Sequence, residues 1–511
     1  MKKTIAGTLI IAVLLSSCAN ASESTSKEEN ANHPTDEIIY EEPEASADYE
    51  EYSGTEMTAA GEEYLSIREN NEVDTELEDT VTISLKVDTA AYTNTVRYIE
   101  SGSVPPADAV RTEEFINYFP YEEETEPTDS PFSISAEVGD SPFSPGKKTA
   151  FIRIKTDDID TSQLPPSNLT FLIDTSGSMD SYDKLPLLKQ AFSLLTDTLT
   201  EDDMVSIVTY AGSSEIVLDS VSGADKDKIL NAINNLSASG STAGADGIDT
   251  AYKLAEKNFR PQGNNRVILA TDGDFNVGYS DTASLEDFVS SKSANGVYLS
   301  ILGFGTGNIR DDIMETLSAH GNGNYGYINS RETAEKLLVD ELGSSLFTVA
   351  DDVKAQVVFN PALVKNYRLI GYENRKLSND DFSNDEKDAG EIGAGSDVAA
   401  MFEFELSDTA ENRSIDEQLM EIRIRYKNPG EDESRLVTKS TSLGDRPLGN
   451  STDFNFACCV AAFSEILRQS QYSDDIRIED CINLASDSLG TDVKGYRSGF
   501  VKLIQEYQDI Y

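Results

Sequence analysis

The 511-residue sequence contains no tryptophan and only two histidines, His33 and His320. A Ser-His-Asp triad needs a histidine oriented beside its nucleophile. His33 lies in an acid-rich segment, and "LSAHGNGNYGY" around the other predicts a turn-rich loop. The chain is therefore not expected to be an enzyme. Metal-assisted hydrolysis is the remaining enzymatic alternative, and it lacks an obvious general base.

Basic residues are also scarce. The chain has 41 Lys and Arg against 92 Asp and Glu, a formal net charge of -51. A field of this sign repels nucleic acid and anionic lipid headgroups, so we expect no nucleic-acid partner. The acidic balance by itself indicates a well-solvated surface.

The apolar run near the N-terminus is too short to span a membrane. It extends from Ile5 to Leu15, about 11 residues against the roughly 20 of a spanning helix, and two lysines precede it. Residues 1–17 therefore predict a signal peptide. The "LSSC" that ends at Cys18 resembles the lipobox of bacterial lipoproteins, with an ordinary signal peptide as the alternative. The resemblance implies lipidation at Cys18 and an extracytoplasmic protein anchored to the bacterial cell membrane or envelope.

Residues 18–62 have few apolar side chains and many acids. Such a segment cannot bury enough apolar surface to offset the entropy lost on ordering. We expect a disordered tether, extended by the repulsion between its like charges.

Three further cysteines are Cys458, Cys459 and Cys481. They form no Cys-x-x-Cys pair, which argues against zinc. They lie in segments of helical pattern, where buried thiols are expected. In an oxidising compartment, a disulfide from Cys481 to either of the other two is the alternative.

Short apolar runs alternate with helical patterns between residues 168 and 347. The runs "LTFLI", "MVSIVTY", "RVILA" and "VYLSILGF" predict strands, and "KLPLLKQAFSLL", "DKILNAINNL" and "GIDTAYKLAEK" predict helices. This alternation is typical of an α/β domain with a doubly wound, mostly parallel sheet.

Regions of β-rich α+β character flank this domain. Residues 74–165 combine runs such as "AFIRIKT" with two short helices broken at Pro105 and Pro106. Residues 349–511 begin with strands such as "VKAQVVF" and end in three helical stretches from Phe454. We expect strands of the two regions to pair into one β-rich unit from which the α/β domain emerges.

Oxygen-bearing side chains follow the first strand of the α/β domain at every second position, as Asp174, Ser176 and Ser178. Thr242, before a predicted helix, and Asp272, where another strand stops, lie at or beside the strand ends where such sheets bind ligands. Hard oxygen donors suit Mg²⁺, Mn²⁺ or Ca²⁺. Asp174 alone is explained as a turn cap, but turn chemistry does not explain matching donors in three loops. The set predicts a divalent-cation site, with Mg²⁺ favoured.

These five residues resemble the metal-ion-dependent adhesion site (MIDAS) of the von Willebrand factor type A (VWA) family. That site combines an Asp-x-Ser-x-Ser run with a Thr and an Asp from two other loops. The resemblance implies that Ser176, Ser178 and Thr242 coordinate directly, while one or both aspartates act through water. It also implies a partner that bears a carboxylate.

The flanking regions extend the resemblance to bacterial YfbK-type proteins, in which a VWA domain lies between N- and C-terminal domains. It rests on residues 74–165 and on the later "DVKAQVVFNPALVKNYRLIGYENRKL" and "GYRSGFVKLI".

We therefore expect a cell-surface protein that binds a protein or other acidic ligand through a metal. The alternatives are an envelope assembly factor whose metal only stabilises loops, and a less favoured metal-assisted hydrolase. Asp180, Asp246 and Asp274 lie beside the ligand loops. They are candidate outer-sphere acceptors or, equally well, solvated loop acids.

Overall fold

The computed structural model describes residues 55–57, 61–122, 130–157, 164–240, 244–273, 282–445 and 450–511. The predicted signal peptide, Cys18 and most of the predicted tether lie outside these residues. Thr242 and Asp274 also lie outside them. Among the described residues, no helix is long and apolar enough to cross a membrane.

A six-stranded sheet forms the α/β domain. Its strands are β7 (Ser167–Asp174), β8 (Met204–Tyr210), β9 (Ser214–Ser222), β10 (Asn264–Thr271), β11 (Tyr298–Phe304) and β12 (Tyr325–Ile328). The order is β12-β11-β10-β7-β8-β9, and only the β8–β9 pair is antiparallel. The chain places β8 and β9 on one side of β7 and β10 to β12 on the other, so strand order reverses at β7. The predicted fold class is confirmed.

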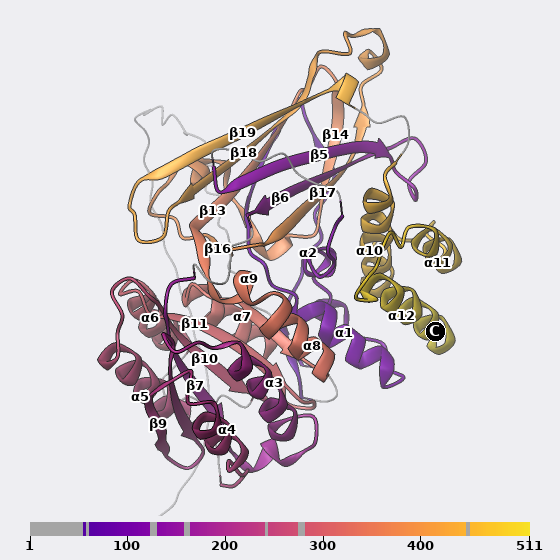
Figure 1. Cartoon of the computed structure of the whole chain (residues 1–511). Helices are drawn as coiled ribbons and strands as arrows, with labels where there is room; N and C mark the ends of the chain where they lie inside the picture. Colours follow the sequence, from indigo (N-terminus) through magenta and orange to yellow (C-terminus); the bar gives the residue numbers. More distant parts are fainter. Residues whose placement is uncertain are drawn as a thin grey trace, which may run out of the picture. The chain divides into compact units, whose positions relative to one another are not determined.

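Helices cover both faces of this sheet (Figure 1). One face carries α3 (Leu185–Thr198), α4 (Lys226–Asn234) and α8 (Arg331–Glu335). The other carries α5 (Gly244–Lys257), α6 (Thr282–Ser293) and α7 (Asp311–His320). Each helix turns a stripe of apolar side chains toward the strands, as its sequence period predicts.

The turn-rich loop predicted over residues 317–327 is shorter than expected, because its first four residues belong to α7 and its last three to β12. His320 is the last residue of α7, because Met314 and Leu317 place a buried stripe on this helix and hold its final turn against the sheet. The helix ends where Gly321 follows.

Strands from both sides of the α/β domain build a β-sandwich. One sheet runs β15-β4-β13-β18-β19 with β16 beside β13, and the other runs β3-β14-β17-β6-β5. Their bounds are β3 (Val73–Asp74), β4 (Thr80–Ser84), β5 (Phe132–Asp140), β6 (Lys148–Thr156), β13 (Thr348–Phe359), β14 (Val364–Ile370), β15 (Lys376–Leu377), β16 (Gly390–Gly393), β17 (Asp397–Leu406), β18 (Gln418–Lys427) and β19 (Ser434–Ser442). Antiparallel pairing of β4 with β13 and of β6 with β17 confirms the expected joint β-rich unit.

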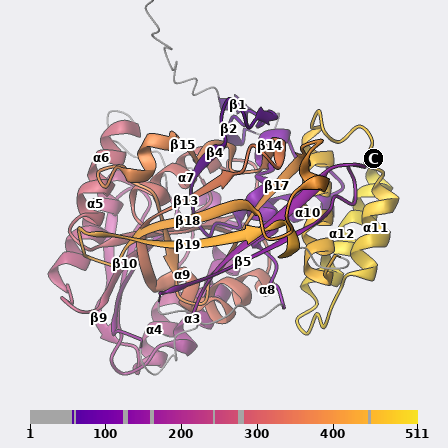
Figure 2. The same ribbon diagram turned by 90° about the horizontal axis from the view of Figure 1, so that it is seen from above.

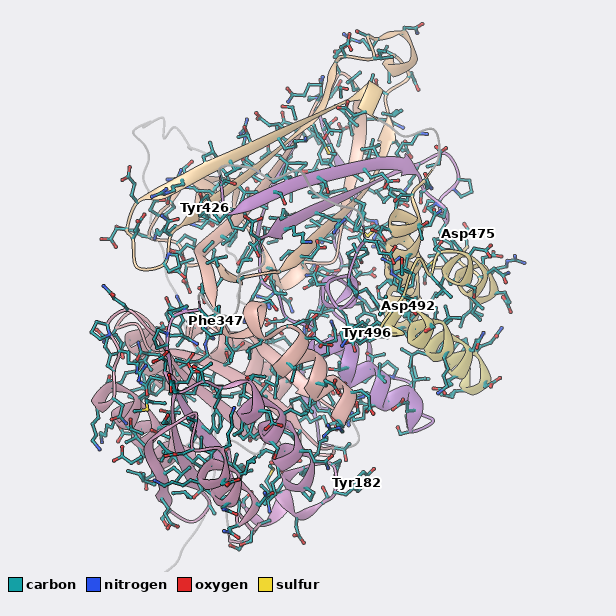
Figure 3. All side chains as sticks on the ribbon, viewed as in Figure 1. Tyr182, Phe347, Tyr426, Asp475, Asp492 and Tyr496 are labelled. Carbon is teal, nitrogen blue, oxygen red and sulfur yellow. The ribbon has the colours of Figure 1, made fainter. Side chains whose placement is uncertain are left out.

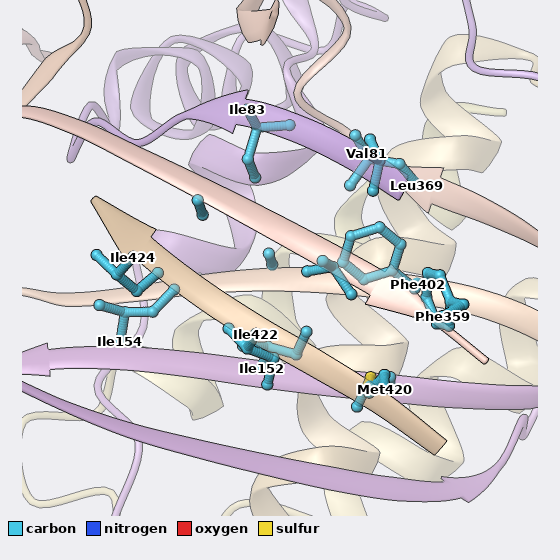
Figure 4. Packing of buried hydrophobic residues seen from close by; sticks show 14 of the residues in the cluster. Val81, Ile83, Ile152, Ile154, Phe359, Leu369, Phe402, Met420, Ile422 and Ile424 are labelled. Carbon is cyan, nitrogen blue, oxygen red and sulfur yellow. The ribbon is translucent and has the colours of Figure 1, made fainter. Parts of the chain in front are cut away.

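The core of the sandwich is filled from both sheets (Figure 4). Ile152 and Ile154 of β6 point into it, whereas Phe151 packs with helices on the opposite face of the sheet. This follows from the two-residue period of a strand. Phe359 and Phe402 meet edge to face between the sheets, with their ring centroids 5.5 Å apart.

Five helices pack against the outer face of the second sheet. They are α1 (Ala90–Glu100), α2 (Thr112–Asn117), α10 (Thr452–Arg468), α11 (Ile478–Asp487) and α12 (Tyr496–Ile510). The last three gather at one end of the sandwich (Figure 2). Cys458, Cys459 and Cys481 are all buried here as free thiols, which is the first of the two predicted alternatives.

The C-terminal end of the predicted tether is ordered. β1 (Thr55–Met57) pairs with β2 (Glu63–Leu65), and Glu62 has only 1% of its surface exposed. The predicted boundary at residue 62 is therefore wrong by several residues. An acidic segment orders where its carboxylates find cationic partners, and Glu62 pairs with Arg97 at 2.8 Å.

We predict that residues 61–165 do not fold alone, because β4 and β6 then lose β13 and β17. Circular dichroism and amide NMR dispersion would check this. Residues 164–347 contain all six strands of the α/β sheet and serve as the folded control. A dispersed NMR spectrum of the first fragment would contradict the prediction.

Candidate metal centre

The two aspartates of the predicted site lie at the same edge of the α/β sheet. Asp174 ends β7, and Asp272 directly follows β10. These strands are parallel neighbours, with Ile173 opposite Ala270. Both side chains are fully buried at this edge. The topology therefore brings together two carboxylates that lie far apart in the sequence.

The hydroxyls of the motif gather beside Asp174. The backbone N–H of Ser176 donates to Asp174 Oδ1 at 2.7 Å, and the Ser176 and Ser178 hydroxyl oxygens lie 2.9 Å apart. Ser176 is buried, whereas Ser178 is exposed at the start of a short 3₁₀ helix, Gly177–Asp180. The loop therefore carries a series of oxygen atoms that runs from the buried Asp174 carboxylate to the exposed Ser178 hydroxyl.

The segment that precedes Thr242 is hydrogen-bonded to this loop. Gly177 N–H donates to the carbonyl of Gly240 at 3.1 Å, and Ser239 N–H donates to the carbonyl of Thr175 at 2.8 Å. A side chain at Gly177 would bring its Cβ within 3.3 Å of the Gly240 oxygen, so close approach favours glycine here. Two of the three predicted loops are therefore in contact.

Burial dominates the electrostatics of Asp174. Desolvation raises the pKa of its carboxyl from 3.8 to about 6, the hydrogen bonds from Ser176 oppose the rise, and Asp272 adds to it. Its Oδ2 atom is buried and has no hydrogen-bond partner among the residues that the structure describes. A buried carboxylate oxygen of this kind is suited to bind a cation.

Lys184 is a component of the site that the sequence analysis missed. Its ammonium lies 2.8 Å from Asp272 Oδ2 and 3.1 Å from Asn308 Oδ1, and the side chain is almost fully buried. The stem of Lys184 passes over Gly305, where a Cβ would lie 2.3 Å from the lysine Cε. Nothing local marks this lysine, because its partners come from distant parts of the chain.

The residues fit a divalent cation. Asp174, Asp272 and Lys184 together carry a formal charge of one negative unit out of water. No cluster of three His, Cys, Asp or Glu side chains capable of holding a metal occurs in the described ranges. A cation at this edge therefore depends on the hydroxyls as well as on the carboxylates, which is the donor chemistry of Mg²⁺, Mn²⁺ or Ca²⁺.

Two of the acids beside the ligand loops are exposed. Asp180 ends the short 3₁₀ helix and Asp246 lies in the first turn of α5, and both face solvent. Asp274 and Thr242 lie outside the described residues.

Comparison with known proteins places the chain in a family. The model "von Willebrand factor type A domain" matches residues 168–341, "von Willebrand factor" matches 58–150, and "Uncharacterized protein YfbK, C-terminal" matches 344–510. YfbK of Escherichia coli (strain K12) is 41% identical over 447 residues, which cover 83% of this chain and 77% of that protein. The chain belongs to the YfbK family. The resemblance to the VWA family and to YfbK-type proteins is confirmed.

More distant relatives share parts of this YfbK-family chain. Inter-alpha-trypsin inhibitor heavy chain H3 of Homo sapiens is 27% identical over 166 residues, 31% of this chain and 18% of the human protein. A solved structure, von Willebrand factor type A from Catenulispora acidiphila, is 16% identical with a TM-score of 0.41 and covers 72% of this chain and 90% of its own.

We predict that Asp174→Asn stabilises the metal-free protein at pH 8. Because the folded-state pKa is raised to about 6, the stability that this group contributes is full below about pH 4 and is lost as pH rises through 6. Asn keeps the acceptor for Ser176 N–H without the charge. The free energy of unfolding should rise by about 2 to 3 kcal/mol at pH 8 and by less at pH 5. Urea unfolding in EDTA measures the free energy of unfolding at both pH values. Equal stabilities of the wild type and Asp174→Asn at pH 8 would contradict the raised pKa of Asp174.

Proposed function

We propose that this protein is a lipid-anchored, extracytoplasmic adhesion protein that binds a protein or other acidic ligand through a divalent cation. The proposed ligand set is Asp174, Ser176, Ser178, Thr242 and Asp272, with Mg²⁺ favoured. The observation that carries the proposal is the pair of fully buried carboxylates at one sheet edge, with hydroxyls leading from them to solvent.

The charge balance of the centre favours an anionic partner. Asp174 and Asp272 contribute two negative units, and Lys184 contributes one positive unit. A divalent cation, when bound, leaves an excess of one positive unit and an open position for a carboxylate oxygen. The Lys184 ammonium stays paired with Asp272, so the excess of one positive unit remains when a cation is bound. An aspartate or glutamate of a partner therefore completes the neutralisation.

An exposed aromatic side chain follows the Asp174–Ser178 run in the chain. Tyr182, two residues after the short 3₁₀ helix that begins beside Ser176, has 86% of its surface exposed and points into solvent (Figure 3). Exposed tyrosines are frequent anchors of protein interfaces, because they bury a large area at low entropic cost. This position supports a protein partner over a small anion.

Anchoring follows from the N-terminal sequence. Cys18 would carry the lipid, and the acidic segment after it would separate the folded chain from the membrane. The runner-up function is an envelope assembly factor in which the cation only holds the 175–177 and 239–240 loops together.

We predict saturable binding of Mg²⁺, Mn²⁺ or Ca²⁺ to the wild type. Affinity should fall more than about tenfold in Asp174→Ala and Asp272→Ala, because each removes a proposed ligand. Isothermal titration measures the affinity, and circular dichroism checks that the variants are folded. Asp219→Ala, an exposed acid of β9, is the matched control. Binding that is absent, or indifferent to both site variants, would remove the proposed centre.

We also predict that the immobilised protein retains partners from cell-envelope extracts in Mg²⁺ and releases them in EDTA. Tyr182→Ala should reduce retention at least about fivefold without changing metal affinity, as expected for an interface anchor. Tyr511→Ala is the matched control, since Tyr511 is 83% exposed at the C-terminus. Retention that survives EDTA would favour the assembly-factor alternative.

A further inference from the structure

A short segment near the start of the described chain docks beside the proposed metal centre. We call Gly61–Leu65 the strap. Glu62 is its buried centre: the Arg97 guanidinium donates to Oε1 at 2.8 Å and to Oε2 at 2.9 Å, and the hydroxyls of Tyr64 and Tyr98 donate to Oε2. These donors outweigh burial and lower the pKa of Glu62 to about 2. The carboxylate is thus charged and held by α1.

The strap also binds the loop that follows β11, Gly305–Arg310, which we call the metal-site loop. Gly307 N–H donates to Glu62 Oε1 at 2.8 Å, and Glu63 N–H donates to the carbonyl of Ile309 at 2.9 Å. Arg310 adds an ion pair with Glu63 at 3.1 Å. Backbone, carboxylate and ion-pair contacts therefore fix the strap to this loop.

The opposite side of the metal-site loop touches the centre itself. Asn308 Oδ1 accepts a hydrogen bond from Lys184, whose ammonium pairs with Asp272. Gly273, the residue after Asp272, packs so closely that a Cβ there would lie 2.4 Å from the Asn308 carbonyl oxygen. The loop therefore holds Asp272 both through Lys184 and through the backbone that follows it.

We propose that Glu62 is a positioning residue of the metal centre, and that the strap couples the N-terminal tether to metal binding. This inference rests on the proposed function. The path runs from Glu62 through Gly307 and Asn308 to Lys184 and Asp272, and each step is a hydrogen bond, an ion pair or a covalent neighbour. Because coupling between sites is reciprocal, an ordered strap raises metal affinity and bound metal protects the strap.

The test compares Mn²⁺ affinity of the full chain in wild type, Glu62→Ala and Glu62→Gln by isothermal titration. Glu62→Ala should lose about five- to tenfold in affinity, the low end of typical coupling. Glu62→Gln keeps an oxygen that can accept from Gly307 and should lose less. Glu465→Gln is the control, because Glu465 is also buried and paired with an arginine, Arg368, but packs in the helical core. It should lower stability without changing affinity.

Two outcomes separate this inference from the proposed function. A wild type that binds no Mn²⁺ overturns both, whereas wild-type affinity in a folded Glu62→Ala overturns the coupling alone. Should Glu62→Ala not fold, hydrogen exchange of the wild type decides. The amides of Glu63 and Gly307 should exchange at least about fivefold more slowly in saturating Mg²⁺ than in EDTA, and unchanged rates overturn the coupling.

Discussion

Two carboxylates held out of water at one sheet edge are the constraint on which the site depends. Burying an ionised carboxylate costs several kcal/mol unless it is paired and hydrogen-bonded. Asp272 has Lys184 as its cationic partner, whereas Asp174 is held by hydrogen bonds, one of them from the Ser176 N–H. Such an arrangement is poorly explained as a stabilising feature of the fold. It agrees with the proposed centre, which a cation would complete while the surrounding loops keep its oxygens in place.

Buried ion pairs also fix the α/β domain to its flanking regions. Arg111, just before α2, pairs with Asp311 in the first turn of α7 at 2.5 Å, and Arg375 pairs with Glu315 of α7 at 3.2 Å. All four side chains are largely buried, and breaking a pair of this kind by removing one partner typically costs about 3 to 5 kcal/mol. Asp311 directly follows the metal-site loop. The sandwich and the helices therefore hold that loop from one end while the strap holds its middle.

The sequence predicts those parts of the molecule whose signal is local. The apolar runs of β7, β8, β10 and β11 are buried on both faces and read as continuous hydrophobic stretches. β9 and β19 were not predicted, because these edge strands are rich in Ser, Thr and charged residues and are only partly buried. Asp174, Ser176 and Ser178 were found because they are spaced in one run.

Lys184 and Glu62 were missed for the opposite reason. Each owes its role to partners far away in the chain, and neither has a neighbour that distinguishes it from a surface charge. Glu62 lies in a segment whose composition favours disorder, and contacts with distant residues such as Arg97 and Gly307 order it. Neither the composition of a sequence nor its hydrophobic period shows which charged residues pair across the fold.

The overall charge of -51 and the proposed preference for an acidic partner act at different ranges. At physiological ionic strength, interactions between exposed charges are screened beyond about 8 Å, so repulsion from distant acids weakens steeply with distance. A carboxylate that reaches the sheet edge is governed instead by the few buried charges around Asp272. An acidic partner gains nothing from long-range attraction and must fit the site closely. In the proposed function, the same surface that repels anionic molecules in general would make the centre selective for those that place a carboxylate correctly.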